Sequence, residues 1–232
     1  MMFSPVLLFI TIGFMVIGMI VSSRLKSKFK QFSQEPLSTG LSGKDIAEKM
    51  LRDNDIRDVQ VISVDGQLTD HYNPANKTVN LSADVYNGRN IASAAVAAHE
   101  CGHAVQHATA YAWLQMRSKL VPVVQFSSTL MNFVLMAGMF MAFTFSMYNQ
   151  MLLVIIVLQG AITIFTLITL PVEIDASRRA LAWLDGARIA RGVENEQAKS
   201  ALSWAALTYI VAALASLASL MYYIMQYLGR RD

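Results

Sequence analysis

Charged residues are scarce in this chain of 232 amino acids, and cysteine is nearly absent. Asp, Glu, Lys and Arg make up 15% of the residues, whereas a soluble domain usually carries about 25%. This deficit, combined with 54% hydrophobic residues, favours a membrane protein. The single cysteine, Cys101, excludes an intramolecular disulfide framework, so no oxidising compartment is implied. The net charge of +3 is modest and the basic residues stand beside apolar runs, so nucleic-acid binding is not predicted.

Long apolar runs without any charged residue occur at four places in the sequence. A helix needs about 20 such residues to cross a bilayer. The runs are Met2–Val21, roughly 121–145, Met151–Leu170 and roughly 202–228. The first run has no basic residue before it and no small-residue cleavage site after it, so we expect a retained span rather than a signal peptide.

The positions of Lys and Arg predict how these spans are oriented. Four consecutive spans place residues 22–120 and 171–201 on the same side of the membrane. Of the 19 basic residues, all but Arg230 and Arg231 lie in these two segments. Because basic loops stay in the cytoplasm, we expect the two segments there and both chain ends outside. The predicted organisation is therefore a first span at 1–21, a cytoplasmic region at 22–120 and a pair of spans at 121–170. A cytoplasmic helix at 171–201 and a last span with the tail at 202–232 follow.

Residues 22–120 contain the signals of a small α+β unit. After a polar connector at 22–40, Ser42 is placed to cap a helix with apolar residues at helical spacing. Val59 and Val61 alternate as in a strand, and the segments 68–72 and 77–81 flank a turn at 73–76, which predicts a hairpin. The alanine-rich run Ile91–His107 predicts a further helix. The unit is small for a core of its own, so we expect it to pack on the membrane helices.

The stretch that carries chemistry is His99-Glu100-Cys101-Gly102-His103. Two histidines four residues apart on a helix share one face, at about 5–6 Å between Cβ atoms, and can reach the same Zn²⁺. Glu100 lies beside them, where a carboxylate can take a proton from a metal-bound water. The alternative is a solvated helix face, but the alanines before His99 indicate a buried helix, in which three unpaired polar groups would be costly.

This pattern is the HExxH arrangement of zinc metallopeptidases. Such an enzyme needs a third protein ligand for its zinc, and three residues are candidates. Glu173 follows the third span on the same predicted side as His99, in a segment that reads as a new helix. The alternative to a ligand role is that Glu173 is simply a negative charge at a helix N-terminus, where the helix dipole favours it. His107 continues the histidine series but lies about 80° around the helix from His99. His71, in the hairpin, is a ligand, a transition-state stabiliser or a surface residue.

The chain resembles the YugP-like membrane zinc metallopeptidases of bacteria over nearly its whole length. The resemblance rests on Gly66–Pro74, Val79–Ser82, Val96–Gln106 and Glu173–Ser177. More distantly the chain is similar to HtpX-type peptidases, in which membrane spans also separate the HExxH helix from a glutamate ligand. These resemblances imply an α-helical membrane protein of the bacterial cell membrane, with four transmembrane helices, a small cytoplasmic zincin-like α+β unit, a Zn²⁺ cofactor, and Glu173 as the third ligand in a gluzincin-like site.

The resemblance also sets expectations around the metal. HtpX-type enzymes carry an aspartate four residues after the ligand glutamate that orients a ligand histidine, and here that position is Ser177. The donor that stabilises the oxyanion is open among His71, Tyr72, Arg178 and Arg179. In zincins a substrate strand commonly pairs with an edge strand beside the HExxH helix, and Val79, Asn80 and Leu81 are the expected edge.

The predicted function is hydrolysis of peptide bonds, with Glu100 as the general base for a zinc-activated water. The expected partners are a polypeptide substrate, the lipid bilayer and, through small residues such as Ala215 and Ser219 in the last span, a second subunit or membrane protein. The main alternative is a zinc-stabilised membrane scaffold or chaperone that cuts nothing. A structural zinc site closes four protein ligands, however, and only three are convincing here. A third alternative is an interaction protein without metal.

Overall fold

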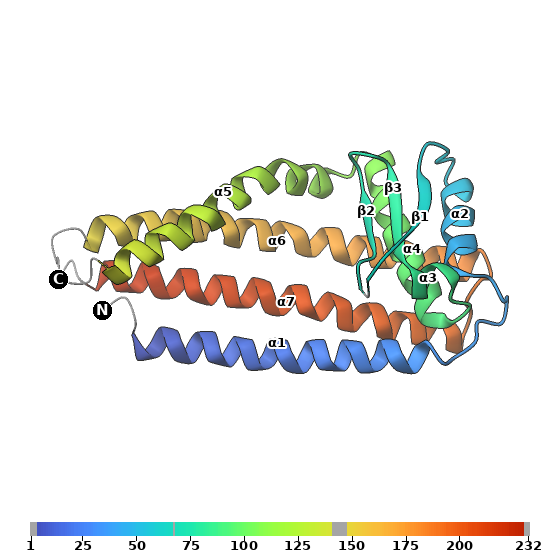
Figure 1. Ribbon diagram of the computed structural model, residues 1–232, viewed down its shortest axis with the longest axis horizontal. Coiled ribbons are helices and arrows are strands. Elements are labelled where there is room, and N and C mark those ends of the chain that lie inside the picture. Colours follow the sequence, from blue (N-terminus) through green and yellow to red (C-terminus); the bar gives the residue numbers. More distant parts are fainter. Residues whose placement is uncertain (1–3, 67, 141–147, 230–232) are drawn as a thin grey trace. The chain divides into compact units, whose positions relative to one another are not determined.

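The computed structural model describes residues 4–66, 68–140 and 148–229. The chain ends, with Arg230 and Arg231, and the first part of the predicted loop Ser146–Gln150 lie outside these residues. Within them the chain is mostly helical, with one three-stranded sheet (Figure 1).

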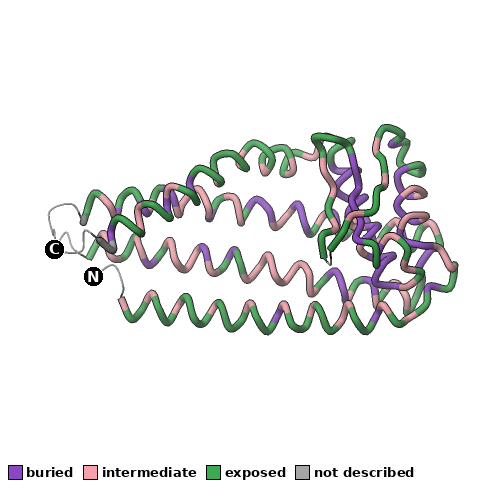
Figure 2. The backbone as a smooth tube through the Cα atoms, in the orientation of Figure 1, coloured by how far each residue is buried: buried purple, intermediate pink, exposed green. Residues whose placement is uncertain are grey.

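Four helices are long and apolar enough to cross a membrane by length and composition. They are α1 (Pro5–Phe32), α5 (Ala112–Phe140), α6 (Tyr148–Gly186) and α7 (Val193–Leu228). Each overlaps most of one predicted apolar run, so the expectation of four such helices is confirmed. Along residues 5–20 of α1 every side chain is at least partly exposed (Figure 2), as expected of an apolar helix that faces lipid.

Two predicted breaks between helices are wrong. Residues 22–32 are not a polar connector but the last three turns of α1, because Leu25, Phe29 and Phe32 repeat at helical spacing and Phe32 is buried. Residues 171–186 are not a new helix, because α6 runs through Pro171 without interruption. A proline in a helix costs one backbone hydrogen bond and does not have to end the helix.

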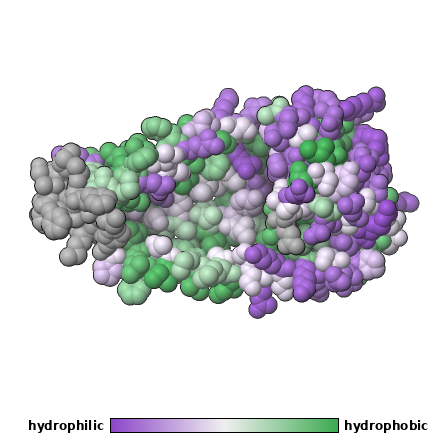
Figure 3. Space-filling model, viewed as in Figure 1, coloured by the Kyte–Doolittle hydropathy of each residue, from purple (hydrophilic) through white to green (hydrophobic). Residues whose placement is uncertain are grey.

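The chain divides into two compact units, which are described separately. The first contains Met1–Ile20, Met116–Leu170 and Thr208–Asp232, and the second Val21–Gln115 and Pro171–Leu207. The boundaries fall inside the long helices, where apolar sequence gives way to polar sequence. Hydrophobic residues predominate on the surface of the first unit and hydrophilic residues on that of the second (Figure 3).

Polar side chains join α6 and α7 inside the first unit. The Gln159 side-chain amide donates to the backbone oxygen and the hydroxyl of Ser216, and the Thr163 hydroxyl lies 2.8 Å from that of Ser216. Ser216 therefore faces α6 of the same chain. Ser219 Oγ donates to the Ala215 backbone oxygen within α7. Contact of Ala215 and Ser219 with a second subunit stays a prediction.

The sheet of the second unit contains β1 (Gln60–Val64), β2 (His71–Asn73) and β3 (Thr78–Ser82) in the order β1-β3-β2. The predicted hairpin is confirmed, since β2 and β3 pair in antiparallel fashion, while β1 is parallel to β3. The expectation that Val79, Asn80 and Leu81 form an edge is wrong. They lie in β3, the central strand, whose residues are all buried. The edges are β1 and β2.

The core of the second unit forms where α2 (Gly43–Asp53) and α4 (Ile91–Ala108) pack with β3. Ser42 caps α2 as predicted, in a capping box with Asp45. In α2, Ile46 and Ala47 are fully buried, and the first two turns of α4 are almost continuously buried (Figure 2). A short helix that the sequence did not suggest, α3 (Ala83–Asn87), links β3 to α4.

Candidate metal centre

Helix α4 carries the two histidines of the HExxH motif on a buried surface. It begins after Asn90, whose side-chain oxygen accepts from the Ser93 backbone N–H. Alanines at 94, 95, 97 and 98 are fully buried, so the backbone of α4 lies close to its neighbours. One turn apart, the rings of His99 and His103 lie edge to face at 4.9 Å between centroids.

Gly102 lets α6 approach α4 closely at this point. A Cβ atom at Gly102 would lie 2.6 Å from the backbone oxygen of Ala176, closer than real Cβ atoms come to other atoms. The glycine therefore allows direct contact between the two helix backbones, and this contact brings Glu173, one turn before Ala176, to the histidines. Because α6 is continuous, Glu173 stands in a helix interior, and the helix-terminus explanation for its charge is wrong.

The structure brings His99, His103 and Glu173 together. Glu173 Oε2 lies 3.4 Å from His99 Nε2 and 3.5 Å from His103 Nε2, and the three candidate ligand atoms lie within 4.8 Å of one another. Tetrahedral zinc with bonds of about 2.0–2.1 Å places neighbouring ligand atoms roughly 3.3 Å apart. The Glu173 contacts match this spacing and are longer than good hydrogen bonds. Two imidazoles and one carboxylate are also the donor set of one class of catalytic zinc site.

The electrostatics of this cluster suit a cation. Burial lowers the pKa of His103, but hydrogen bonding to Glu173 and the negative charges of Glu100 and Glu173 outweigh burial, so that its pKa is raised above the ordinary value. Two carboxylates around the buried His103 and the partly buried His99 therefore attract positive charge, which a zinc ion would supply.

Each candidate ligand histidine has a partner for its second ring nitrogen. Ser177 Oγ lies 3.1 Å from His99 Nδ1, which agrees with the expectation that Ser177 stands where related enzymes have an orienting aspartate. For His103 the partner is Gln106, with its Oε1 3.0 Å from His103 Nδ1. The Gln106 side-chain amide donates to the Val172 backbone oxygen and to Asp175 Oδ2. Sequence reasoning missed Gln106, although a polar residue three positions after a ligand on a buried helix was a usable signal.

Glu100 and the edge strand β2 meet on an adjacent side of α4. Glu100 is 9% exposed, and its Oε2 accepts from the Tyr72 backbone N–H at 3.0 Å. The Tyr72 hydroxyl lies 2.8 Å from Nδ1 of His107, which is exposed. Tyr72 thus runs along α4 from Glu100 to His107.

Of the other predicted residues, His71 and Arg178 are not part of the cluster. His71 is exposed, and its Nδ1 lies 2.7 Å from the Thr69 backbone oxygen. Arg178 is exposed and lines a cavity with Ile174 and Ser177. Cys101, inside the motif, is fully buried, and its thiol is directed at the Ala47 backbone oxygen. Burial raises the pKa of the Cys101 thiol, so the group stays protonated and does not serve as a nucleophile or a metal ligand.

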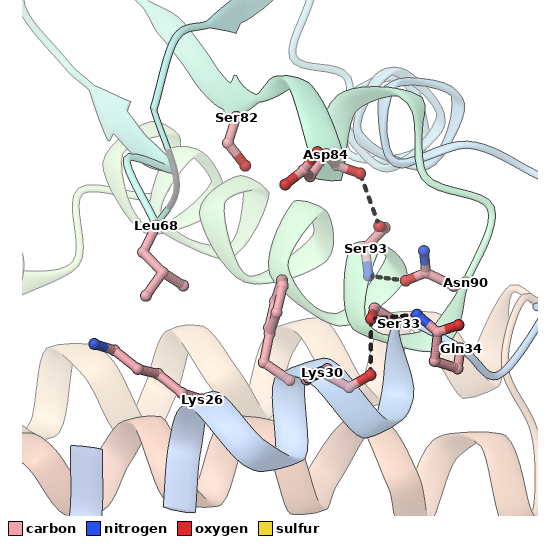
Figure 4. Close-up of a pocket in the computed structure, with 10 residues that line it drawn as sticks. Lys26, Lys30, Ser33, Gln34, Leu68, Ser82, Asp84, Asn90 and Ser93 are labelled. Carbon is pink, nitrogen blue, oxygen red and sulfur yellow. Dashed lines mark hydrogen bonds between the residues drawn. The ribbon is translucent and has the colours of Figure 1, made fainter. Parts of the chain in front are cut away.

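A separate cavity of about 670 Å³ lies in the same unit (Figure 4). It is bounded by Lys26 and Lys30 of α1 on one side and by Ser82, Asp84 and Ser93 on the other. None of the candidate metal ligands lines it, so the cavity is not the metal centre.

Comparison with known proteins gives consistent results. Residues 7–228 match the model of a family described as "Putative neutral zinc metallopeptidase". The chain is 39% identical to the "Putative membrane protease YugP" of Bacillus subtilis (strain 168) over 225 residues, which is 97% of this chain and 98% of that protein. No solved structure matches the chain. The family match spans nearly all of the sequence, and the chain therefore belongs to the "Putative neutral zinc metallopeptidase" family.

Proposed function

We propose that the protein is a membrane-bound zinc endopeptidase that hydrolyses membrane or membrane-proximal polypeptides. The observation that carries this proposal is the convergence of the partly buried His99 with the buried His103 and Glu173, beside Glu100. Family membership supports zinc as the metal and a polypeptide as the substrate.

His99, His103 and Glu173 would hold the zinc ion through Nε2, Nε2 and Oε2. Three protein ligands leave a tetrahedral site one position for water or substrate, as catalytic zinc sites do. Zinc, when bound, supplies Lewis acidity that activates a water molecule and polarises the scissile carbonyl.

Glu100 is the general base in this mechanism. It neighbours His99 and His103 on α4, and its hydrogen bond from the Tyr72 backbone N–H holds the carboxylate in place. That bond involves Oε2, so Oε1 is the oxygen we assign to the water. Glu100 takes the proton as the water attacks the carbonyl carbon, and it donates the proton to the leaving amine as the peptide bond breaks.

The substrate strand pairs with β2 rather than with β3. Strand β2 is an edge, and the Tyr72 N–H points away from β3 toward the general base. An extended peptide added along this edge would lie next to Glu100, which already accepts the Tyr72 N–H. Of the predicted oxyanion donors we assign the role to the Tyr72 hydroxyl, because the Tyr72 backbone N–H contacts Glu100, whereas His71 and Arg178 are exposed and Arg179 is bound to Asp175.

Glu100→Gln tests the proposal. Glutamine keeps the shape of the side chain but cannot take the proton, so hydrolysis of an unfolded polypeptide should fall by ~10²–10⁴-fold. Zinc content, measured by elemental analysis of the purified protein, should stay at the wild-type level. The control is Glu48→Gln, which alters a glutamate in surface ion pairs. Wild-type turnover by Glu100→Gln with zinc bound would instead support the scaffold alternative.

We further propose that residues 22–120 and 171–201 face the cytoplasm, as the distribution of basic residues predicts. Cysteine labelling can test this with little background, because the native Cys101 is fully buried. A cysteine at exposed Gln150 should react with an impermeant reagent added outside intact cells, whereas one at exposed Arg57 should not. The opposite labelling pattern would reverse the orientation.

A further inference from the structure

Gln106 is a completely buried polar residue whose hydrogen bonds form a chain between α4 and α6. It is 0% exposed, and both ends of its amide have partners. Burying an amide costs free energy unless it is hydrogen-bonded, and a methionine would fill the same volume without that requirement. The amide therefore has a role beyond packing.

The two partners of the Gln106 nitrogen fix the orientation of the amide. The Val172 backbone oxygen, at 2.8 Å, can only accept a hydrogen bond, and the ionised Asp175 carboxylate, at 2.9 Å, also only accepts. The end of the amide that faces them must be the NH₂ group. Oε1 of Gln106 therefore faces His103.

This orientation in turn selects the tautomer of His103. Because Oε1 is only an acceptor, His103 Nδ1 must carry the hydrogen of their 3.0 Å hydrogen bond. In neutral His103, the lone pair then lies on Nε2, the atom 3.5 Å from Glu173 Oε2. We propose that Gln106 and Asp175 act as positioning residues that hold His103 in the tautomer that binds zinc. This inference rests on the proposed function, because it needs the cluster to bind zinc.

Asp175 is itself held in place. Arg179 Nε donates to Asp175 Oδ2 at 2.6 Å, and the Arg179 guanidinium lies over the ring of Tyr111, 5.6 Å from its centroid. Helix α6 thus presents the candidate ligand Glu173 and also supplies the support for both histidines, from Ser177 and Asp175. Ser177 reaches His99 directly, and Asp175 reaches His103 through Gln106. The two supports differ, since a serine hydroxyl can donate or accept and does not select a tautomer.

The test uses the purified full-length protein and measures zinc affinity by competition with a chelator. Gln106→Met keeps the volume but loses the amide, and zinc should bind 10–100-fold more weakly, as when a group that orients a ligand is removed elsewhere. Asp175→Asn should weaken binding less, because the Val172 oxygen still orients the amide. The matched control is Asp53→Asn, which removes a carboxylate that also accepts from a basic residue four positions away and from Trp183; its zinc affinity should equal that of wild type.

A second measurement separates tautomer selection from a purely structural role. In the zinc-free protein labelled with ¹⁵N-histidine, wild-type His103 should show a protonated Nδ1 and an unprotonated Nε2 at a pH where the ring is neutral. Gln106→Met should show a mixture of the two tautomers. Wild-type zinc affinity in Gln106→Met, or an unchanged tautomer in that variant, would overturn the inference. Failure of the wild-type protein itself to bind zinc would refute the proposed function instead.

Discussion

Two neighbouring sides of α4 differ sharply in their surroundings. The side toward α6 carries His99, His103 and Gln106, whose side chains contact Glu173, Ser177 and Asp175 in a largely buried interface. The side toward β2 carries Glu100 and the exposed His107, and Tyr72 bridges them with a backbone N–H and a hydroxyl.

The difference reflects two requirements of a hydrolytic metal site. A metal is held tightly when its ligands are fixed by packing and by further hydrogen bonds, which favours a buried helix–helix contact. A polypeptide substrate must reach the metal and the general base, which favours an accessible strand edge. We therefore expect substitutions on the α6 side to remove zinc and those on the β2 side to remove turnover with zinc still bound.

The largest effect on the α6 side should come from Glu173→Ala. With only two imidazoles left as ligands, zinc occupancy should fall. The hydrolysis rate should fall as well, by at least the ~10²–10⁴-fold expected for loss of a general base. Zinc analysis and a peptide hydrolysis assay check this. His107→Ala and His71→Ala should keep their zinc, and metal loss in either of them with full occupancy in Glu173→Ala would make this ligand assignment wrong.

Gly102→Ala should have the next largest effect, because the added Cβ meets the Ala176 backbone oxygen at 2.6 Å. We expect about 1–3 kcal/mol of lost stability from overpacking, with weaker zinc binding as α6 moves away. Thermal unfolding with and without zinc measures both. Gly160→Ala is the matched control, since it has open space around a helical glycine and should be neutral or slightly stabilising. Equal behaviour of the two variants would show that close contact at Gly102 is not required.

Tyr72→Phe tests the β2 side by removing only the hydroxyl that contacts His107. Zinc content should not change. If the hydroxyl stabilises the oxyanion, kcat should fall by roughly 10²–10³-fold, as for loss of an oxyanion donor. Steady-state kinetics on one peptide decide the point. A rise in KM alone would limit Tyr72 to substrate binding, and loss of zinc would contradict the division between the two sides.

Ser177→Ala should have the smallest effect of the four. It removes the partner of His99 Nδ1, but that ring also contacts Glu173 and the ring of His103. We expect zinc affinity to fall by no more than the low end of the 10–100-fold range for an orienting group. Chelator competition, measured side by side on Ser177→Ala and Gln106→Met, ranks the two losses of zinc affinity. A larger loss in Ser177→Ala would show that His99, not His103, depends more on its orienting group.

The sequence alone predicted the elements that depend on local pattern. Four apolar runs gave four long helices, the serine cap at Ser42 and the turn after Asn73 were in place, and the spacing of His99 and His103 put both on one helix face. The predicted helix ends before residues 22 and 171 were wrong because a few polar residues or one proline do not outweigh helix continuation when apolar residues recur at helical spacing.

Strand order and the surroundings of each ligand were decided only by the tertiary structure. Val79, Asn80 and Leu81 have the same local pattern whether they are central or at an edge, and pairing with both β1 and β2 made them central. The partnership of Gln106 with Asp175 joins residues 69 positions apart and depends on how closely α4 and α6 pack at Gly102. Helical spacing reports what one helix presents on each face. It carries no information about which other helix meets that face, because that contact follows from the packing of the whole unit.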